Sequence, residues 1–134
     1  AIGGRPASAH ARHEWPVDVC APWAMGGIRD DGTLTRLQAA SVAGAANNQL
    51  AESRHGAERQ RAGILYAPDY AINAGGIINI SHEGPNYDRK RAFAHVARIH
   101  DTLLTVFARA EADGVATNEA ADRIARDRIQ AAAG

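Results

Sequence analysis

The sequence predicts an α/β fold: half of a doubly wound parallel sheet, with about three strands, followed by two long helices. Three short apolar runs, at 17–20, 41–45 and 64–66, are typical of buried strands. Helix-forming segments separate these runs, and strands that alternate with helices are typical of parallel sheets. Apolar residues then recur at helical spacing over 88–113, and capping residues with oppositely charged pairs at i,i+4 spacing indicate a last helix over 117–132. We therefore expect residues 1–134 to form one partial domain.

Composition limits the possible functions. The chain has 134 residues and 15 basic against 15 acidic side chains, and this balance gives no support to a nucleic-acid or membrane-surface partner. No apolar run reaches the roughly 18 residues of a membrane span, and the first residues are not typical of a signal peptide. The single cysteine, Cys20, cannot form an internal disulfide. We therefore expect a cytoplasmic location.

The loops that follow the strands are the expected place for a site, because ligands of open parallel sheets lie beyond the carboxyl ends of the strands. The loop after 17–20 includes Trp23–Gly27, which is small enough for a flat ring to approach the backbone. The second strand ends near Asn47 and Asn48, whose carboxamides offer both donors and acceptors. An ordinary turn is the alternative for these asparagines, and composition alone favours it.

The third strand, Ile64–Tyr66, is predicted to be buried on both faces and to end at Pro68. The segment Asn73–Gly76 then precedes a run of isoleucines. Two glycines weaken a helix by roughly 1 kcal/mol each, which suggests that something approaches the backbone closely here. A plain turn followed by helix packing is the alternative.

The remaining helices are predicted from polar patterns and capping residues. We expect a short helix within Asp30–Gln38, an exposed helix over Ser53–Ala62 that ends near Gly63, and a long helix capped by Asn86 or Asp88. Gly114 is the expected C-cap of the long helix, and Thr117 the N-cap of the last one. His100 falls on the apolar side of the long helix, so we expect it in the core.

Two patterns that resemble chemical sites have simpler explanations. His10 and His13 have a spacing that can place two imidazoles together, but no third ligand is evident, so we expect surface histidines and no metal site. Cys20 has no base beside it in the sequence, so a packed, inert thiol is expected.

Several ordered blocks resemble a known family. The segments Val17–Pro22 with Ala24–Gly27, Val42–Leu50 and Ala67–Ile80 are similar to the leucine/phenylalanine/valine dehydrogenases of the glutamate dehydrogenase superfamily. These enzymes oxidatively deaminate L-amino acids with NAD. Further similarity runs from Tyr87 through Arg123 to about Ile129. The resemblance implies that residues 1–82 form the second half of a Rossmann-type NAD-binding domain and residues 83–134 the C-terminal helices.

The resemblance also implies binding residues. The cofactor-side positions are Ala24, Met25, Gly26 and Asn48, and Asn48 would help to position the nicotinamide riboside. The substrate-side positions are Asn73, Ile77 and Ile80. Branched aliphatic residues at 77 and 80 favour an aliphatic amino acid as substrate over phenylalanine.

Other parts of the family pattern are not found in this sequence. No Gly-x-Gly-x-x-Gly phosphate turn occurs, and the one lysine, Lys90, lies between two arginines at an expected helix start. The family's catalytic lysines and aspartate belong to a separate N-terminal domain, so no catalytic residue is assigned to this chain. We expect a C-terminal enzyme segment that is inactive alone, with that domain as its partner in a homo-oligomer. The alternative is a non-catalytic fragment or remnant that self-associates through the edge left by the missing half.

Overall fold

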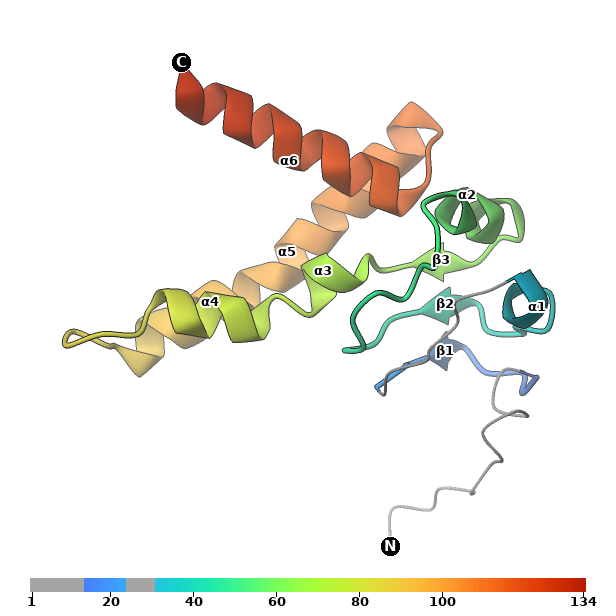
Figure 1. Cartoon of the computed structure of the whole chain (residues 1–134), viewed down its shortest axis with the longest axis horizontal. Coiled ribbons are helices and arrows are strands. Elements are labelled where there is room, and N and C mark those ends of the chain that lie inside the picture. The colour runs from blue at the N-terminus through green and yellow to red at the C-terminus, as the bar shows by residue number, and fades with distance from the viewer. Residues whose placement is uncertain (1–13, 24–30) are drawn as a thin grey trace, which may run out of the picture.

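The structure is a computed structural model that describes residues 14–23 and 31–134 (Figure 1). Its elements, in chain order, are β1 (Val19–Cys20), α1 (Asp31–Leu34), β2 (Ser41–Val42), α2 (Arg54–Arg61), β3 (Leu65–Tyr66), α3 (Asp69–Ile72), α4 (Gly75–Ser81), α5 (Arg89–Asp113) and α6 (Thr117–Ala133). The described residues thus form an α/β unit that ends in two long helices, as the sequence predicts.

The three strands form one parallel sheet in the order β1-β2-β3. Ser41 lies between Val19 and Leu65, and Val42 lies between Cys20 and Tyr66. Each strand is shorter than predicted, because β1 and β3 begin later than expected and β2 ends earlier. Backbone hydrogen bonds nevertheless continue beyond the strands, and the N–H of Ala67 donates to the carbonyl of Val42 over 2.9 Å.

One face of the sheet is packed and the other is partly open. Side chains alternate between the two faces of a strand. Val42, Ile64 and Tyr66 share a face and form a core with Cys20, Leu34, Leu37 and Leu50. On the opposite face Val19 is 54% exposed and Leu65 is 46% exposed. The prediction that 64–66 is buried on both faces is therefore wrong, since the described core covers only one of them.

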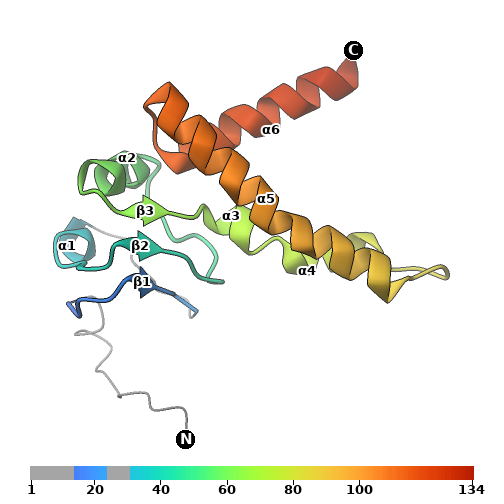
Figure 2. The same ribbon diagram turned by 180° about the vertical axis from the view of Figure 1, so that it is seen from behind.

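The later helices extend away from the sheet and return to it. Figures 1 and 2 show α3 and α4 leading away from the strand ends, with α5 running back beside them. Asp88 caps α5 by accepting the N–H groups of Lys90 (2.8 Å) and Arg91 (3.3 Å). Gly114 ends the helix in a left-handed conformation with φ of 66°. Both predicted ends of the long helix are confirmed.

A second core joins α5 to α6. Val106 and Ala110 of α5 are buried against Ala120 and Ala121 of α6, with Phe107, Val115 and Ile124 at the edge. Three of these four buried residues are alanines, whose small side chains allow the two helices to pack closely. His100 is not in this core or the other. It is exposed beside Asp101, so the prediction of a core histidine is wrong.

Two further predictions about helices need correction. The helix α2 is not wholly exposed, because His55 and Arg59 are buried on its inner side. Thr117 does not cap α6: the N-cap is Ala116, and the Thr117 hydroxyl donates to the carbonyl of Tyr66 over 2.6 Å. This carbonyl lies on the edge strand, where β2 does not satisfy it, and the hydrogen bond fixes the start of α6 against β3.

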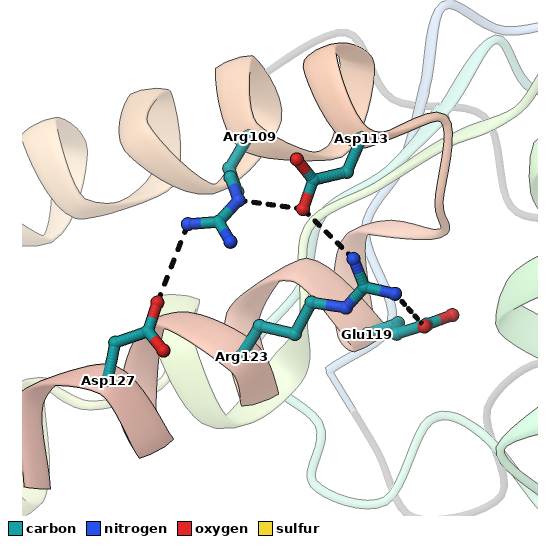
Figure 3. Close-up of polar contacts among 5 residues, drawn as sticks. All are labelled: Arg109, Asp113, Glu119, Arg123 and Asp127. Atoms are coloured by element: carbon teal, nitrogen blue, oxygen red, sulfur yellow. Dashed lines mark hydrogen bonds and ion pairs between the residues drawn. The ribbon is translucent and has the colours of Figure 1, made fainter. Parts of the chain in front are cut away.

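On the solvent side, a chain of ion pairs joins α5 to α6 (Figure 3). Asp113 accepts from Arg109 over 2.7 Å and from Arg123 over 3.0 Å. Arg123 also donates to Glu119 over 2.7 Å, and Arg109 lies 3.5 Å from Asp127. The hydrogen bond from Arg109 is the main reason that the pKa of Asp113 lies below its ordinary value.

We predict that Asp113→Asn lowers the free energy of unfolding at neutral pH, and that this difference disappears in acid. A lowered pKa means that the folded state takes up the proton less readily than the unfolded state. The stabilisation is therefore complete above the unfolded pKa of 3.8 and is lost as the pH falls through the folded pKa. Urea unfolding at several pH values between about 3 and 7 measures it. Asp101→Asn, exposed on the same helix, is the control, and a difference independent of pH would contradict this account.

Candidate functional site at the strand ends

The carboxyl ends of β1 and β2 are in direct contact. The N–H of Ala46 donates to the carbonyl of Pro22 over 2.9 Å. Gly44 packs so closely against Pro22 that an added Cβ would lie 2.3 Å from the same carbonyl oxygen. Only a residue without a side chain allows this approach, so the loop after β2 is fixed against the loop after β1.

Gln49 closes the loop that follows β2. Its side chain is buried and donates through Nε2 to the carbonyls of Gly44 and Ala46, each over 2.8 Å. These hydrogen bonds satisfy two backbone carbonyls that lie beyond the end of β2. They also hold residues 44–49 together as one compact loop. We call this segment the site loop.

Asp69 joins the site loop to the start of α3. Its buried carboxylate accepts the backbone N–H of Gln49, and it also accepts the N–H of Tyr70 over 2.7 Å. The N–H of Asp69 in turn donates to the hydroxyl of Tyr66 over 3.1 Å. Hydrogen bonds to a carboxylate are among the stronger ones in proteins, so the loops after β2 and β3 are held together.

Arg59 completes this buried polar group from the side of α2. It is 1% exposed, donates to the carbonyl of Gln49 over 3.0 Å, and lies over the Tyr66 ring at 4.6 Å from its centroid. Burial lowers the pKa of the Arg59 guanidinium and raises the pKa of Tyr66 to about 12. The positive charge of Arg59 offsets the buried charge of Asp69 nearby, which reduces the cost of burying either one.

The anchored site loop presents two exposed asparagines. Asn48 has a φ of 53°, a left-handed conformation that asparagine tolerates better than most residues. The side-chain oxygen of Asn47 accepts a hydrogen bond from Asn73, at the end of α3. Asn48 also lines a polar pocket of about 310 Å³ that includes Asp69, Tyr70 and Asp122. The structure thus brings carboxamides from two neighbouring loops to the carboxyl end of the sheet.

The other predicted binding residues are more dispersed. Ala24, Met25 and Gly26 lie outside the described residues, as do His10 and His13. Ile77 and Ile80 are 70% and 61% exposed on α4, and neither lines the pocket that contains Asn48. Among the described residues, no group of three or more side chains could hold a metal ion. No described helix is long and apolar enough to cross a membrane.

Sequence reasoning missed the residues that hold the site loop. Gln49, Arg59 and Asp69 are polar and stand in segments that otherwise resemble turns or an exposed helix. One signal was available: an acidic residue directly after Pro68, at a strand end and a helix start, is well placed to accept backbone N–H groups. Nothing in the local pattern of α2 distinguishes the buried Arg59 from its exposed neighbours.

Comparison with known proteins decides the family. No family model matches the chain. It is 53% identical over 114 residues to an L-tryptophan dehydrogenase of Nostoc punctiforme, covering 84% of this chain and 32% of that protein. A leucine dehydrogenase of Thermoactinomyces intermedius is 50% identical over 113 residues, covering 84% of this chain and 31% of that protein. The chain belongs to the leucine/phenylalanine/valine dehydrogenase family. It spans about a third of the length of these relatives.

The same family contains a solved structure with the same fold. The crystal structure of L-tryptophan dehydrogenase from Nostoc punctiforme superposes with a TM-score of 0.84 at 50% identity, covering 88% of this chain and 35% of that one. A hetero-hexameric glutamate dehydrogenase from Thermus thermophilus gives a TM-score of 0.57 at 26% identity, covering 95% of this chain and 33% of that one. The resemblance to this dehydrogenase family and its superfamily is confirmed.

We predict that Gly44→Ala lowers the free energy of unfolding by about 1 to 3 kcal/mol, because a methyl group there overlaps the backbone of Pro22. The matched control is Gly76→Ala in α4, where nothing lies within 4 Å of the added atom. Alanine is the better helix former by about 1 kcal/mol, so this control should be neutral or stabilising. Urea unfolding of both variants gives the comparison, and equal stability of the two would contradict the close packing.

We predict that Asp69→Asn costs about 1 to 3 kcal/mol, because a carboxamide cannot accept both buried N–H groups without turning a donor toward one of them. Hydrogen exchange should also accelerate at the backbone amide of Gln49, while amides within α6 stay protected until global unfolding. Asp101→Asn, exposed on α5, is the control. Unchanged exchange at Gln49 would show that Asp69 does not hold the site loop.

Proposed function

We propose that this chain is the C-terminal segment of an NAD-dependent L-amino-acid dehydrogenase, in which it forms the nicotinamide side of the active site. The complete enzyme would convert an aliphatic L-amino acid, NAD and water to a 2-oxo acid, ammonia and NADH. The observation that carries this proposal is the 53% identity with an L-tryptophan dehydrogenase over 84% of the chain. In the proposed division, residues 1–82 are the second half of the NAD-binding domain and residues 83–134 are the C-terminal helices.

The site loop is chemically suited to the nicotinamide end of NAD. Exposed carboxamides can accept hydrogen bonds from ribose hydroxyls. They can also donate a hydrogen bond to the nicotinamide amide group and accept one from it. Asn48 would orient the riboside, and Ala24, Met25 and Gly26 would lie on the same side of the cofactor. The buried group of Gln49, Arg59 and Asp69 would keep Asn48 in place. When bound, NAD accepts the hydride that leaves the substrate carbon.

The substrate side is assigned to Asn73, Ile77 and Ile80. Asn73 is held by Asn47 of the site loop, so it would bring the start of α4 toward the cofactor side. The exposed side chains of Ile77 and Ile80 would cover the substrate side chain and exclude water from it. We assign no general base to this chain. The catalytic lysines and aspartate would come from the rest of a longer enzyme, which we propose is a homo-oligomer.

The proposal can be tested in a chimera that carries this chain in place of the matching part of the Nostoc punctiforme enzyme. We expect NADH formation from hydrophobic L-amino acids. Asn48→Ala should lower kcat/KM for NAD at least tenfold, or about 1.4 kcal/mol. Asn86→Ala, in the loop before α5, is the control and should change nothing. A folded chimera that forms no NADH, or equal effects of the two variants, would contradict the proposal, as would turnover near 10 per second by the 134-residue chain alone.

The substrate assignment gives a separate prediction. In the same chimera, Ile77→Ala should raise kcat/KM for phenylalanine relative to valine, because it enlarges the space for the substrate side chain. The change should be modest, since apolar pockets discriminate by about 1 to 3 kcal/mol per methylene. Ile129→Ala removes an equally exposed isoleucine from α6 and is the control. If the ratio of the two substrates does not move, Ile77 does not contact the substrate.

A non-catalytic, self-associating chain is the second candidate. The observation that favours it is the pair of apolar residues Val19 and Leu65, which are half exposed on one face of the sheet. An open sheet face and an edge strand both favour association. Light scattering of the chain over a range of concentrations tests this. Mass that rises with concentration supports self-association, and a dilution-insensitive monomer excludes it.

A further inference from the structure

A basic pocket lies where the end of α4 meets α5. The pocket has a volume of about 330 Å³ and is lined by His82, Arg91, Ala94, His95 and Arg98. Arg91, His95 and Arg98 are four and three residues apart on α5, so they share one face of that helix. His82 reaches them from the residue that ends α4. Four side chains that carry or can carry positive charge therefore surround one hollow.

No acidic side chain lines this pocket, and the same is true of the adjoining pocket of about 280 Å³. That second pocket shares His95 and Arg98 and adds Tyr70 of α3 and Arg128 of α6. Glu83, next to His82, is exposed. The carboxylate of Asp88 accepts the backbone N–H of Arg91 over 3.3 Å, so one acidic group lies near these residues, but no residue of the pocket lining balances its positive charge.

The two histidines are in direct contact. His82 Nε2 and His95 Nδ1 are 3.0 Å apart, and the rings meet edge to face with centroids 5.3 Å apart. A hydrogen bond between two ring nitrogens requires one to donate and the other to accept, so the pair cannot be fully protonated in this arrangement. Each histidine has a second ring nitrogen outside this contact, and an N–H there can donate to an anion.

We propose that this pocket binds a tetrahedral oxyanion of the sulfate or phosphate class, with His82, Arg91, His95 and Arg98 as the donors. A pair of imidazoles this close also suits a metal ion, but two neighbouring guanidinium groups repel a cation. The same groups favour an anion with several oxygens, because arginine donates in a fork that matches such oxygens.

The primary test uses sulfate, whose charge does not change near neutral pH. Calorimetric titration of the 134-residue chain should give saturable binding of one sulfate. Chloride at equal ionic strength is the reference for general screening. In the unchanged chain, imidazole and guanidinium NMR signals should shift at His82, His95, Arg91 and Arg98. Binding that does not saturate, or shifts spread over arginines of all helices, would overturn the proposal.

Matched variants separate the site from general charge. His95→Gln and Arg98→Gln should each weaken sulfate binding about fivefold or more. His100→Gln, an exposed histidine of the same helix, should bind as the unchanged chain does. Circular dichroism checks that each variant is folded. Equal affinities of His95→Gln and His100→Gln would contradict the proposal.

A second titration identifies the source of the anion. Glycerol 2-phosphate and inorganic phosphate share the tetrahedral oxyanion but differ in their organic part. Binding of inorganic phosphate alone supports a site for a free anion, and tighter binding of the monoester supports a site for a phosphorylated metabolite. Failure of both to compete with sulfate would overturn the assignment of the ligand class.

Discussion

The hydrogen bonds from the backbone of Gln49 to the carboxylate of Asp69 and from Arg59 to the carbonyl of Gln49 hold this structure together at its functional end. They join the loop after β2, the start of α3 and the inner side of α2 at one buried residue. The strands themselves are only two residues long, so the sheet alone does not fix the positions of the loops that follow it. The positions of Asn47, Asn48 and Asn73 therefore depend on a buried polar group, whose loss is costly because each partner is left unpaired in a dry environment.

Much of the fold follows from local patterns. The three strands, the long helix with Asp88 and Gly114 at its ends, and the last helix were predictable because each depends on residues close in sequence. The similarity of ordered blocks indicated the family, which the comparisons confirm. Asn48 and Asn73 were predicted as site residues, and the structure brings them to adjacent loops, although their contact with ligands stays a prediction.

The errors have a common physical cause. Arg59, His100 and Thr117 were assigned from the pattern of their own helices, but their surroundings are decided by other elements. Arg59 is buried because Tyr66 and Gln49 lie against it, and Thr117 bonds to a strand carbonyl more than 50 residues earlier in the chain. His100 is exposed because α3 and α4 lie against the face of α5 that carries His95, Ile99 and Thr102. Such tertiary contacts leave no periodic signal in the sequence.

The central claim is that the site loop, held by Asp69 and Arg59, forms the nicotinamide side of an NAD site. The most direct measurement is a crystal structure, with NAD bound, of the chimera between this chain and the Nostoc punctiforme enzyme. The account predicts that the nicotinamide riboside lies within hydrogen-bond distance of the Asn48 carboxamide, with the Gln49 to Asp69 contact intact. A nicotinamide bound elsewhere, such as in the pocket of about 590 Å³ beside Phe107 and Val115, would contradict it.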